Sequence, residues 1–314
     1  MPLNGIFQSK RMNLYENISL NKRKSVFLVC TFFAIIGLLG YAFGYYIGDK
    51  LIGIGFAISL CIIMTLISFY SGDKIILSMS SAKPADRKKY PHLVNAVEGL
   101  SIAAGIPMPQ IYIIEDSAIN AFATGRDPKH ASITVTTGAI IRLKRDELEC
   151  VLSHELSHIR NYDVRMMVFV VMLVGIIALL SDVFLRSIIY GRKRENDGRG
   201  GGLIMVVMVA AGLILAALSP IIAQMIKFAV SREREFLADA DGSLISRNPR
   251  GLANALEKIR DDKEPLVEAA NKATAHLFIE NPLRTFSGNI NKLNILFSTH
   301  PDINERIRRL KNAG

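Results

Sequence analysis

The chain has 314 residues and a formal net charge of +10 at pH 7, and 50% of its residues are hydrophobic. This composition argues against an ordinary soluble domain, which would be more polar. It also argues against a nucleic-acid-binding protein, because that function needs a basic face on a soluble domain and no recognition motif is present. Lysine and arginine beside membrane helices set orientation and contact anionic lipid, so we expect a lipid bilayer, and no nucleic acid, as a partner.

Four apolar stretches account for the hydrophobic excess. They are Ser25–Ile47, Leu51–Tyr70, Met166–Ser181 and Leu203–Ala223. About 20 apolar residues cross a bilayer core, and the third stretch falls short because Asp182 and Arg186 interrupt its far end. The first two stretches almost touch in sequence, which predicts a transmembrane hairpin. Gly40, Gly44 and Gly48 recur every four residues, which either allows the two helices to approach closely or reflects how common glycine is in membrane helices.

The stretches divide the chain into five segments: a basic N-terminal segment (1–24), the hairpin (25–70), a first polar part (71–165), a second hydrophobic helix pair (166–226) and a second polar part (227–314). By the positive-inside rule the N-terminal segment is cytoplasmic, and the hairpin returns the chain to that side. We expect the second pair to span as well, despite the basic loop at 191–202. Asn120 then lies on the cytoplasmic side and Asn196 outside.

Periodicity predicts helices and a few strands in the polar parts. Apolar residues at helical spacing and the flanking prolines favour these helices: Pro91–Ala104, one opening at Asp146, Ser231–Ser246, Pro249–Arg260 and Ile303–Asn312. β-Branched and aromatic residues favour these strands: Gln110–Ile114, Ile133–Thr136 and, between them, Asn120–Thr124. The predicted fold class is α+β: a polytopic α-helical membrane protein with a mainly helical catalytic domain that carries a small β-sheet.

The sequence His154-Glu155-Leu156-Ser157-His158 is an HExxH motif. On a helix, residues four apart share a face, so two imidazoles can bind one zinc ion. The glutamate beside the first histidine can take the proton of the attacking water. The alternative is a surface helix with two unrelated histidines, but the apolar residues around the motif predict a partly buried helix, and buried histidines need partners.

A catalytic zinc ion usually has three protein ligands, so a third must come from elsewhere. The short pattern with a histidine at position 164 is excluded, because that position holds Val164. Glu235 and Asp239 lie one turn apart on one helix face, so that one can bind metal while the other orients a histidine. Glu233 lacks such a partner. The alternative is a solvated charged helix.

With these motifs in view, the chain resembles the HtpX family of membrane zinc peptidases, which are zincin-like relatives of the CAAX prenyl-protein endopeptidases. The resemblance covers nearly the whole length. It rests on these segments: Asn13–Glu16, Asn120–Gly125, His154–Asp163, Ser231–Asp239, Thr299–Pro301 and Arg306-Ile307. Asp302 stands where many members have a second proline.

The resemblance implies roles for individual residues. It implies one zinc ion per chain held by His154, His158 and Glu235, with Glu155 as the general base. It also implies that Asp239 supports His154. Two further roles follow from it: His300 faces the substrate carbonyl, and the strand Asn120, Ala121, Phe122 and Ala123 pairs with the substrate backbone.

We therefore expect a zinc metalloendopeptidase that hydrolyses membrane, membrane-adjacent or unfolded polypeptides, with a role in membrane protein quality control implied by the resemblance. We expect it in a bacterial or archaeal inner membrane, with its catalytic domain facing the cytoplasm. Charged residues flank the motif on both sides, which places it outside the hydrocarbon core. Two alternatives remain. One is a CAAX-type processing protease. The other is a non-enzymatic membrane protein with structural zinc, which would need a fourth ligand such as the nearby Cys150.

Overall fold

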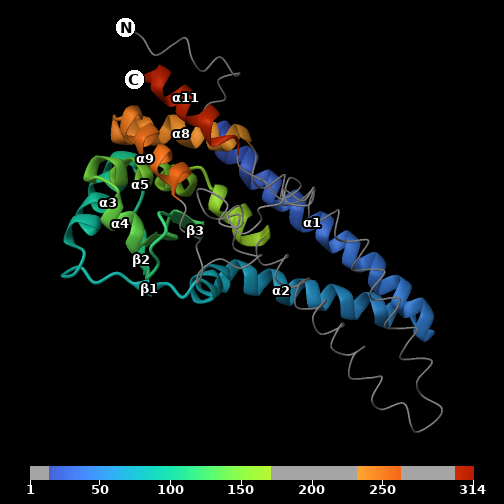
Figure 1. The fold of residues 1–314 in the computed structure, drawn as a ribbon. Coiled ribbons are helices and arrows are strands. Elements are labelled where there is room, and N and C mark those ends of the chain that lie inside the picture. The colour runs from blue at the N-terminus through green and yellow to red at the C-terminus, as the bar shows by residue number, and fades with distance from the viewer. Residues whose placement is uncertain (1–13, 171–231, 263–300) are drawn as a thin grey trace.

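The computed structural model describes residues 14–170, 232–262 and 301–314. It is mostly helical with a small mixed sheet, as predicted. Helices α1 (Leu14–Ile47) and α2 (Lys50–Met79) form a hairpin that projects away from the other elements (Figure 1). Among the described residues, α2 is the one helix that is long and apolar enough to cross a membrane. Apart from residues 166–170, the predicted second hydrophobic pair lies outside the described residues.

Close glycine contacts hold the two helices of the hairpin together. A Cβ at Gly40 would lie 2.4 Å from the Cβ of Ala57, and one at Gly53 would lie 2.3 Å from the carbonyl oxygen of Gly40. A Cβ at Gly44 would likewise collide with the backbone of α2. Gly48 instead adopts a φ of 97° just after α1 and has open space around it. The glycine pattern thus combines two roles, close approach at Gly40 and Gly44 and a left-handed turn at Gly48.

Both helices are longer than their apolar stretches. α1 begins well before Ser25, and α2 continues past Tyr70 to Met79. The extension of α2 is explained by packing, because Ile76 is fully buried against Ile114 and Phe122 of the sheet.

The sheet has four strands in the order β1-β2-β4-β3: β1 (Lys83–Pro84), β2 (Gln110–Ile114), β3 (Ala121–Asp127) and β4 (His130–Thr136). β2 and β4 are parallel, whereas β1–β2 and β3–β4 are antiparallel. β2 has the predicted bounds. β3 and β4 are longer than predicted because they form a hairpin, in which Asp127 accepts hydrogen bonds from the backbone of residues 129 and 130. β3 lies at the edge of the sheet.

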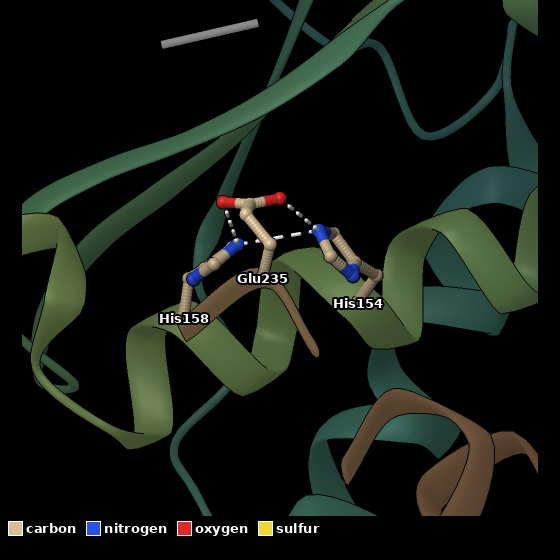
Figure 2. A group of neighbouring side chains, drawn as sticks. All are labelled: His154, His158 and Glu235. Carbon is tan, nitrogen blue, oxygen red and sulfur yellow. Dashed lines mark hydrogen bonds and ion pairs between the residues drawn. The ribbon is translucent and has the colours of Figure 1, made fainter. Parts of the chain in front are cut away.

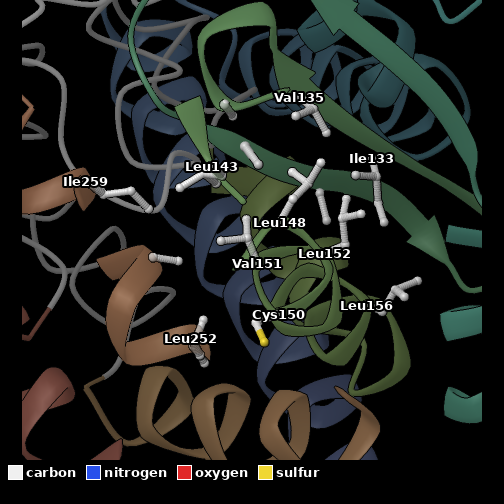
Figure 3. Close-up of a cluster of buried hydrophobic side chains, with 14 of the residues drawn as sticks. Ile133, Val135, Leu143, Leu148, Cys150, Val151, Leu152, Leu156, Leu252 and Ile259 are labelled. Carbon is white, nitrogen blue, oxygen red and sulfur yellow. The ribbon is translucent and has the colours of Figure 1, made fainter. Parts of the chain in front are cut away.

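The remaining helices enclose a core on one face of the sheet (Figures 1 and 3). Those with bounds wholly inside the described residues are α3 (Pro91–Ala104), α4 (Thr137–Arg142), α5 (Arg145–Arg160), α8 (Arg232–Ser246), α9 (Pro249–Asp261) and α11 (Ile303–Ala313). α3 has the predicted bounds, and α5, α9 and α11 differ from prediction by one residue at an end. α8 ends at Ser246 as predicted, and its predicted first residue, Ser231, lies outside the described residues. The core includes Ile133 and Val135 of β4 and Leu152 and Leu156 of α5, all fully buried. α5 is therefore fixed against the sheet, with its HExxH residues near the edge strand β3.

Candidate metal centre

The position of α5 is determined at its N-terminus and along its apolar face. The Glu147 carboxylate accepts a 2.7 Å hydrogen bond from the backbone N–H of Lys144 and a 2.6 Å hydrogen bond from Nζ of Lys258 on α9. A carboxylate in the first turn also interacts favourably with the helix dipole. His154 and Glu155 are buried, and His158 is partly buried. The motif therefore lies on a well-packed helix, rather than on a solvated surface helix.

Helix α8 crosses α5 at His154. A Cβ at Gly242 would lie 2.9 Å from both the backbone nitrogen and the Cα of His154, so only glycine allows the two backbones this close. This approach brings Glu235 and Asp239 of α8, both buried, to the histidines. Glu233 is exposed. The spacing argument that separated Glu235 and Asp239 from Glu233 therefore agrees with the packing.

Three side chains converge at one point (Figure 2). Nε2 of His154 lies 3.2 Å from Nε2 of His158, and each lies 3.7 Å from one oxygen of Glu235. Two ligands bound tetrahedrally to zinc at about 2.0–2.1 Å would be roughly 3.4 Å apart. The two Nε2 atoms are thus spaced as two ligands of one zinc ion. Glu235 presents a different oxygen to each histidine, and one ligand atom from each of the three residues lies within 4.8 Å of the others.

The other ring nitrogen of each histidine faces a carboxylate. Nδ1 of His154 lies 3.1 Å from Oδ1 of Asp239, and Nδ1 of His158 lies 3.0 Å from Oδ2 of Asp163. Such partners place the proton on Nδ1 and leave the lone pair of Nε2 for a metal. Asp239 is the residue to which the resemblance assigns the support of His154, and the structure places it beside that ring. Asp163 ends the segment His154–Asp163 that resembles HtpX, but no sequence pattern indicated its contact with His158.

Arg306 of α11 is a further residue of this cluster whose role the sequence did not indicate. Its Nε and Nη2 donate to the two oxygens of Asp239 at 2.9 and 2.7 Å, and its Nη1 lies 3.4 Å from Oε2 of Glu235. Its side chain is 1% exposed. An arginine between the apolar residues of an amphipathic helix, such as Ile303 and Ile307, is the signal that could have indicated it. It fixes Asp239, and its Nη2 also lies 3.4 Å from Nε2 of His154.

The chain matches the model of Peptidase family M48 over residues 87–313. It belongs to this family. It is 43% identical to a protease HtpX homolog of Caldanaerobacter subterraneus over 307 residues, covering 96% of this chain and 98% of that protein. It is 42% identical to a protease HtpX homolog of Dictyoglomus turgidum over 305 residues, covering 97% and 96% respectively. These relatives confirm the resemblance to HtpX, and the chain is a metallopeptidase.

A crystal structure of S. mikatae Ste24p matches with a TM-score of 0.49 and 19% identity, covering 94% of this chain and 67% of that one.

The charges around the two histidines of this M48 peptidase favour a divalent cation. Among the described residues, the buried charged groups around the histidines are four carboxylates and two guanidinium groups: Glu155, Asp163, Glu235, Asp239, Arg234 and Arg306. When both histidines are neutral, as metal ligands must be, two negative charges are left over among these groups, and buried charges need compensation. A divalent metal ion would balance them, so the donor set fits the metal that an M48 peptidase requires.

The environment also shifts pKa values. Burial raises the pKa of Glu155 above its ordinary value, and the nearby histidines oppose this shift. Burial lowers the pKa of His158, but its hydrogen bond to Asp163 and the charge of Glu235 outweigh burial and bring this pKa to about 9. Burial raises the pKa of Asp239, but Arg306 and His154 outweigh it, and the net shift is downward.

The predicted substrate strand lies beside the M48 centre. Asn120 immediately precedes β3, and Ala121, Phe122 and Ala123 begin it; all four residues are buried. Two backbone N–H groups on the outer edge of β3 already have hydrogen-bond acceptors. The N–H of Ala121 donates to Oδ1 of Asn120 at 3.0 Å, and the N–H of Ala123 donates to the Glu155 carboxylate. His300 lies outside the described residues.

Proposed function

We propose that the chain is a zinc-dependent endopeptidase in which His154, His158 and Glu235 hold one zinc ion. The observation that carries this proposal is the convergence of the two Nε2 atoms, which lie 3.2 Å apart, on the Glu235 carboxylate, with a different oxygen 3.7 Å from each and with both Nδ1 atoms facing carboxylates. Two neutral imidazoles and a carboxylate are a donor set that zinc uses in peptidases.

Zinc, when bound, lowers the pKa of a coordinated water and polarises a carbonyl group. The chain supplies the proton transfers. Glu155 would take the proton of the attacking water and deliver it to the leaving amine. Burial, which raises the pKa of Glu155, suits a group that must both accept and release a proton near neutral pH. Asp239 and Asp163 would keep the two imidazoles oriented during these steps.

Substrate would bind as a strand along the outer edge of β3, beside Asn120, Ala121, Phe122 and Ala123. Two displacements would accompany binding: Asn120 would release the N–H of Ala121, and Glu155 would release the N–H of Ala123. Glu155 would then be free to turn to the water. His300, which the HtpX resemblance places opposite the scissile carbonyl, belongs to the same proposal.

The substrates we propose are membrane, membrane-adjacent or unfolded polypeptides, in the setting of membrane protein quality control. The α1–α2 hairpin supports this, because it would anchor residues 71–165 and 227–314, as two parts of one catalytic domain, at the cytoplasmic face of a bacterial or archaeal inner membrane. The protease HtpX homologs that the chain resembles support the same reading. The helix pair at 166–226 would be the second membrane segment.

Cleavage of an unfolded membrane protein by the purified full chain in detergent tests the proposal. We expect cleavage that stops when a chelator removes the metal and returns on addition of zinc, with the Glu155→Gln variant inactive throughout. Absence of cleavage by chain that holds one zinc ion would contradict it. Cleavage of prenylated peptides alone would instead favour the CAAX-type alternative.

A structural zinc site is disfavoured by the position of Cys150. Its Sγ donates to the carbonyl oxygen of Asn248 at 3.2 Å, and burial raises the pKa of this thiol to about 11. A thiol must lose its proton to bind zinc, so Cys150 is a poor fourth ligand.

A further inference from the structure

Asn21 of α1 lies next to the turn that follows the HExxH helix. Its side-chain amide is buried and donates two hydrogen bonds, one to the carbonyl oxygen of Asn161 at 2.9 Å and one to Oδ1 of Asp163 at 2.7 Å. An asparagine amide group has two N–H donors, and both are used here. These bonds join residues about 140 positions apart in the chain. Asn21 precedes the apolar stretch of α1 and was not indicated by any motif.

The turn that Asn21 contacts requires support from outside. α5 ends at Arg160, and the carbonyl groups at a helix C-terminus lack partners within the helix. Tyr162 has a φ of 61°, a left-handed conformation that costs a non-glycine residue roughly 1–3 kcal/mol. Asn21 supplies a donor to the carbonyl of Asn161, and Nζ of Lys22 lies 4.4 Å from the centre of the Tyr162 ring. The start of α1 therefore contacts all three residues of the turn, 161 to 163.

The turn brings Asp163 back to the metal centre. Its Oδ2 lies 3.0 Å from Nδ1 of His158, while its Oδ1 accepts from Asn21. With one oxygen held by Asn21, the carboxylate can present the other to His158 in one orientation. Nε2 of His158 then points to His154 and Glu235 (Figure 2). Arg234 Nη1 is 3.8 Å from Oδ1, so its approach is longer than that of Asn21.

We propose that Asn21 is a positioning residue of the metal centre, which orients His158 through Asp163 and makes the membrane hairpin a part of the site. This inference rests on the proposed zinc function. It implies that the catalytic domain has its full metal affinity only when α1 is docked, so that displacement of α1 weakens the hold on the metal. The carboxylate that Asn21 holds is the hydrogen-bond partner of a proposed metal ligand. Loss of such a partner typically costs about 10–100-fold in metal affinity.

The test compares three variants of the full chain in detergent. Asn21→Ala removes the amide. Asn21→Asp keeps the shape, but replaces the donor with a carboxylate that faces Asp163. Ser25→Ala is the matched control, since Ser25 is also buried, lies one turn further along α1, and donates only to the backbone oxygen of Asn21. Zinc affinity is measured by competition with a chromophoric chelator, and the visible spectrum of the cobalt-substituted protein reports the ligand geometry.

We expect Asn21→Ala to lose roughly tenfold in zinc affinity, the low end of the range for removed histidine partners, and to alter the cobalt spectrum. Asn21→Asp should lose more, although it is the closer match in shape, and Ser25→Ala should resemble wild type. If Asn21 acted only by packing, Asn21→Ala would lose more zinc affinity than Asn21→Asp. Wild-type affinity in both Asn21 variants, or an equal loss in Ser25→Ala, would overturn the inference while leaving the proposed function intact. A wild-type chain that binds no zinc would overturn both.

Discussion

Gly242 of α8 and His154 of α5 touch through their backbones, at the point where the two helices that form the metal centre cross. Because a Cβ at Gly242 would be 2.9 Å from the nitrogen and the Cα of His154, the contact sets the distance between the helices. Glu235 and Asp239 reach His154 only at this distance. The geometry of the site thus depends on a residue that contributes no side chain to it.

Replacement of Gly242 by alanine should push α8 away from α5. We expect a loss of unfolding free energy of about 1–3 kcal/mol from overpacking, together with weaker zinc binding. Gly99→Ala in α3 is the control, because nothing lies within 4 Å of its added Cβ. That change should stabilise the chain by roughly 0.5–1 kcal/mol, as glycine-to-alanine changes in helices do. Thermal unfolding and metal analysis of both variants check the prediction, and equal behaviour of the two would contradict it.

The Glu155→Gln variant should lose proteolysis but keep its metal. Glutamine cannot take the proton from water, whereas the three proposed ligands are unchanged. Activity should fall by at least about 10²–10⁴-fold, the usual contribution of a general base. Cleavage assays and zinc content of the same preparation measure the two properties. Substantial activity in a folded, zinc-loaded Gln variant would rule out Glu155 as the base.

The two glutamates of α8 should behave differently. Glu235 is buried and has a different carboxylate oxygen 3.7 Å from Nε2 of each histidine, whereas Glu233 is exposed on another side of the helix. We expect Glu235→Ala to cost more than the roughly 10–100-fold in affinity that loss of an outer partner costs, and Glu233→Ala to be close to wild type. Metal analysis after dialysis distinguishes them. Similar zinc loss in both variants would remove Glu235 as the third ligand.

Zinc affinity should rise with pH. In the metal-free chain the pKa of His158 is about 9, against an ordinary 6.5, because Asp163 and Glu235 outweigh the effect of burial. Zinc must displace this proton, so affinity should increase by about tenfold per pH unit between pH 6.5 and 9 and level off above. Calorimetric titration of the metal-free chain in buffers of different ionisation enthalpy counts the released protons. A pH-independent affinity would contradict the assignment.

Stability of the metal-free chain should change in the opposite direction. A folded-state pKa raised above the unfolded value means that the protonated form is favoured by folding. The contribution of His158 is therefore fully present below pH 6.5 and is lost as the pH rises through 9. Denaturant unfolding in chelator, across the same pH series, measures it.

The sequence predicted what depends on short-range spacing. The i, i+4 pairs His154/His158 and Glu235/Asp239 were readable because a helix places such residues on one face. The bounds of α3 and β2 were readable because proline and β-branched residues mark them. The start of α1 and the end of α2 were not predicted, because hydropathy reports the apolar stretch and both helices extend beyond it.

Contacts between segments that are distant in the sequence could not be predicted from it. Arg306, Asp163 and Asn21 reach the site from α11, from the turn after α5 and from α1, and no local pattern fixes how these elements dock. The close crossing at Gly242 is of the same kind, because the glycine has meaning only beside His154. The convergence of His154, His158 and Glu235, with Asp239 beside them, was therefore predictable, and the contacts of Arg306, Asp163 and Asn21 were not.

The proposed topology can be tested at exposed positions on either side of the hairpin. Asn120 is 5% exposed and is a poor labelling site, whereas the Arg87 side chain is 70% exposed. Lys50, at the tip between α1 and α2, is also exposed.

In a chain whose three cysteines are replaced by alanine, we expect an impermeant maleimide to label Lys50→Cys in intact cells and Arg87→Cys only after lysis. This follows from the proposed orientation, in which the basic segment before α1 would lie in the cytoplasm and two crossings would return the chain there. Labelling of Arg87→Cys from outside would invert the orientation and put the metal centre on the other face. Labelling of neither residue in intact cells would show that the hairpin tip does not reach the outside, and would leave α1 and α2 without a spanning role.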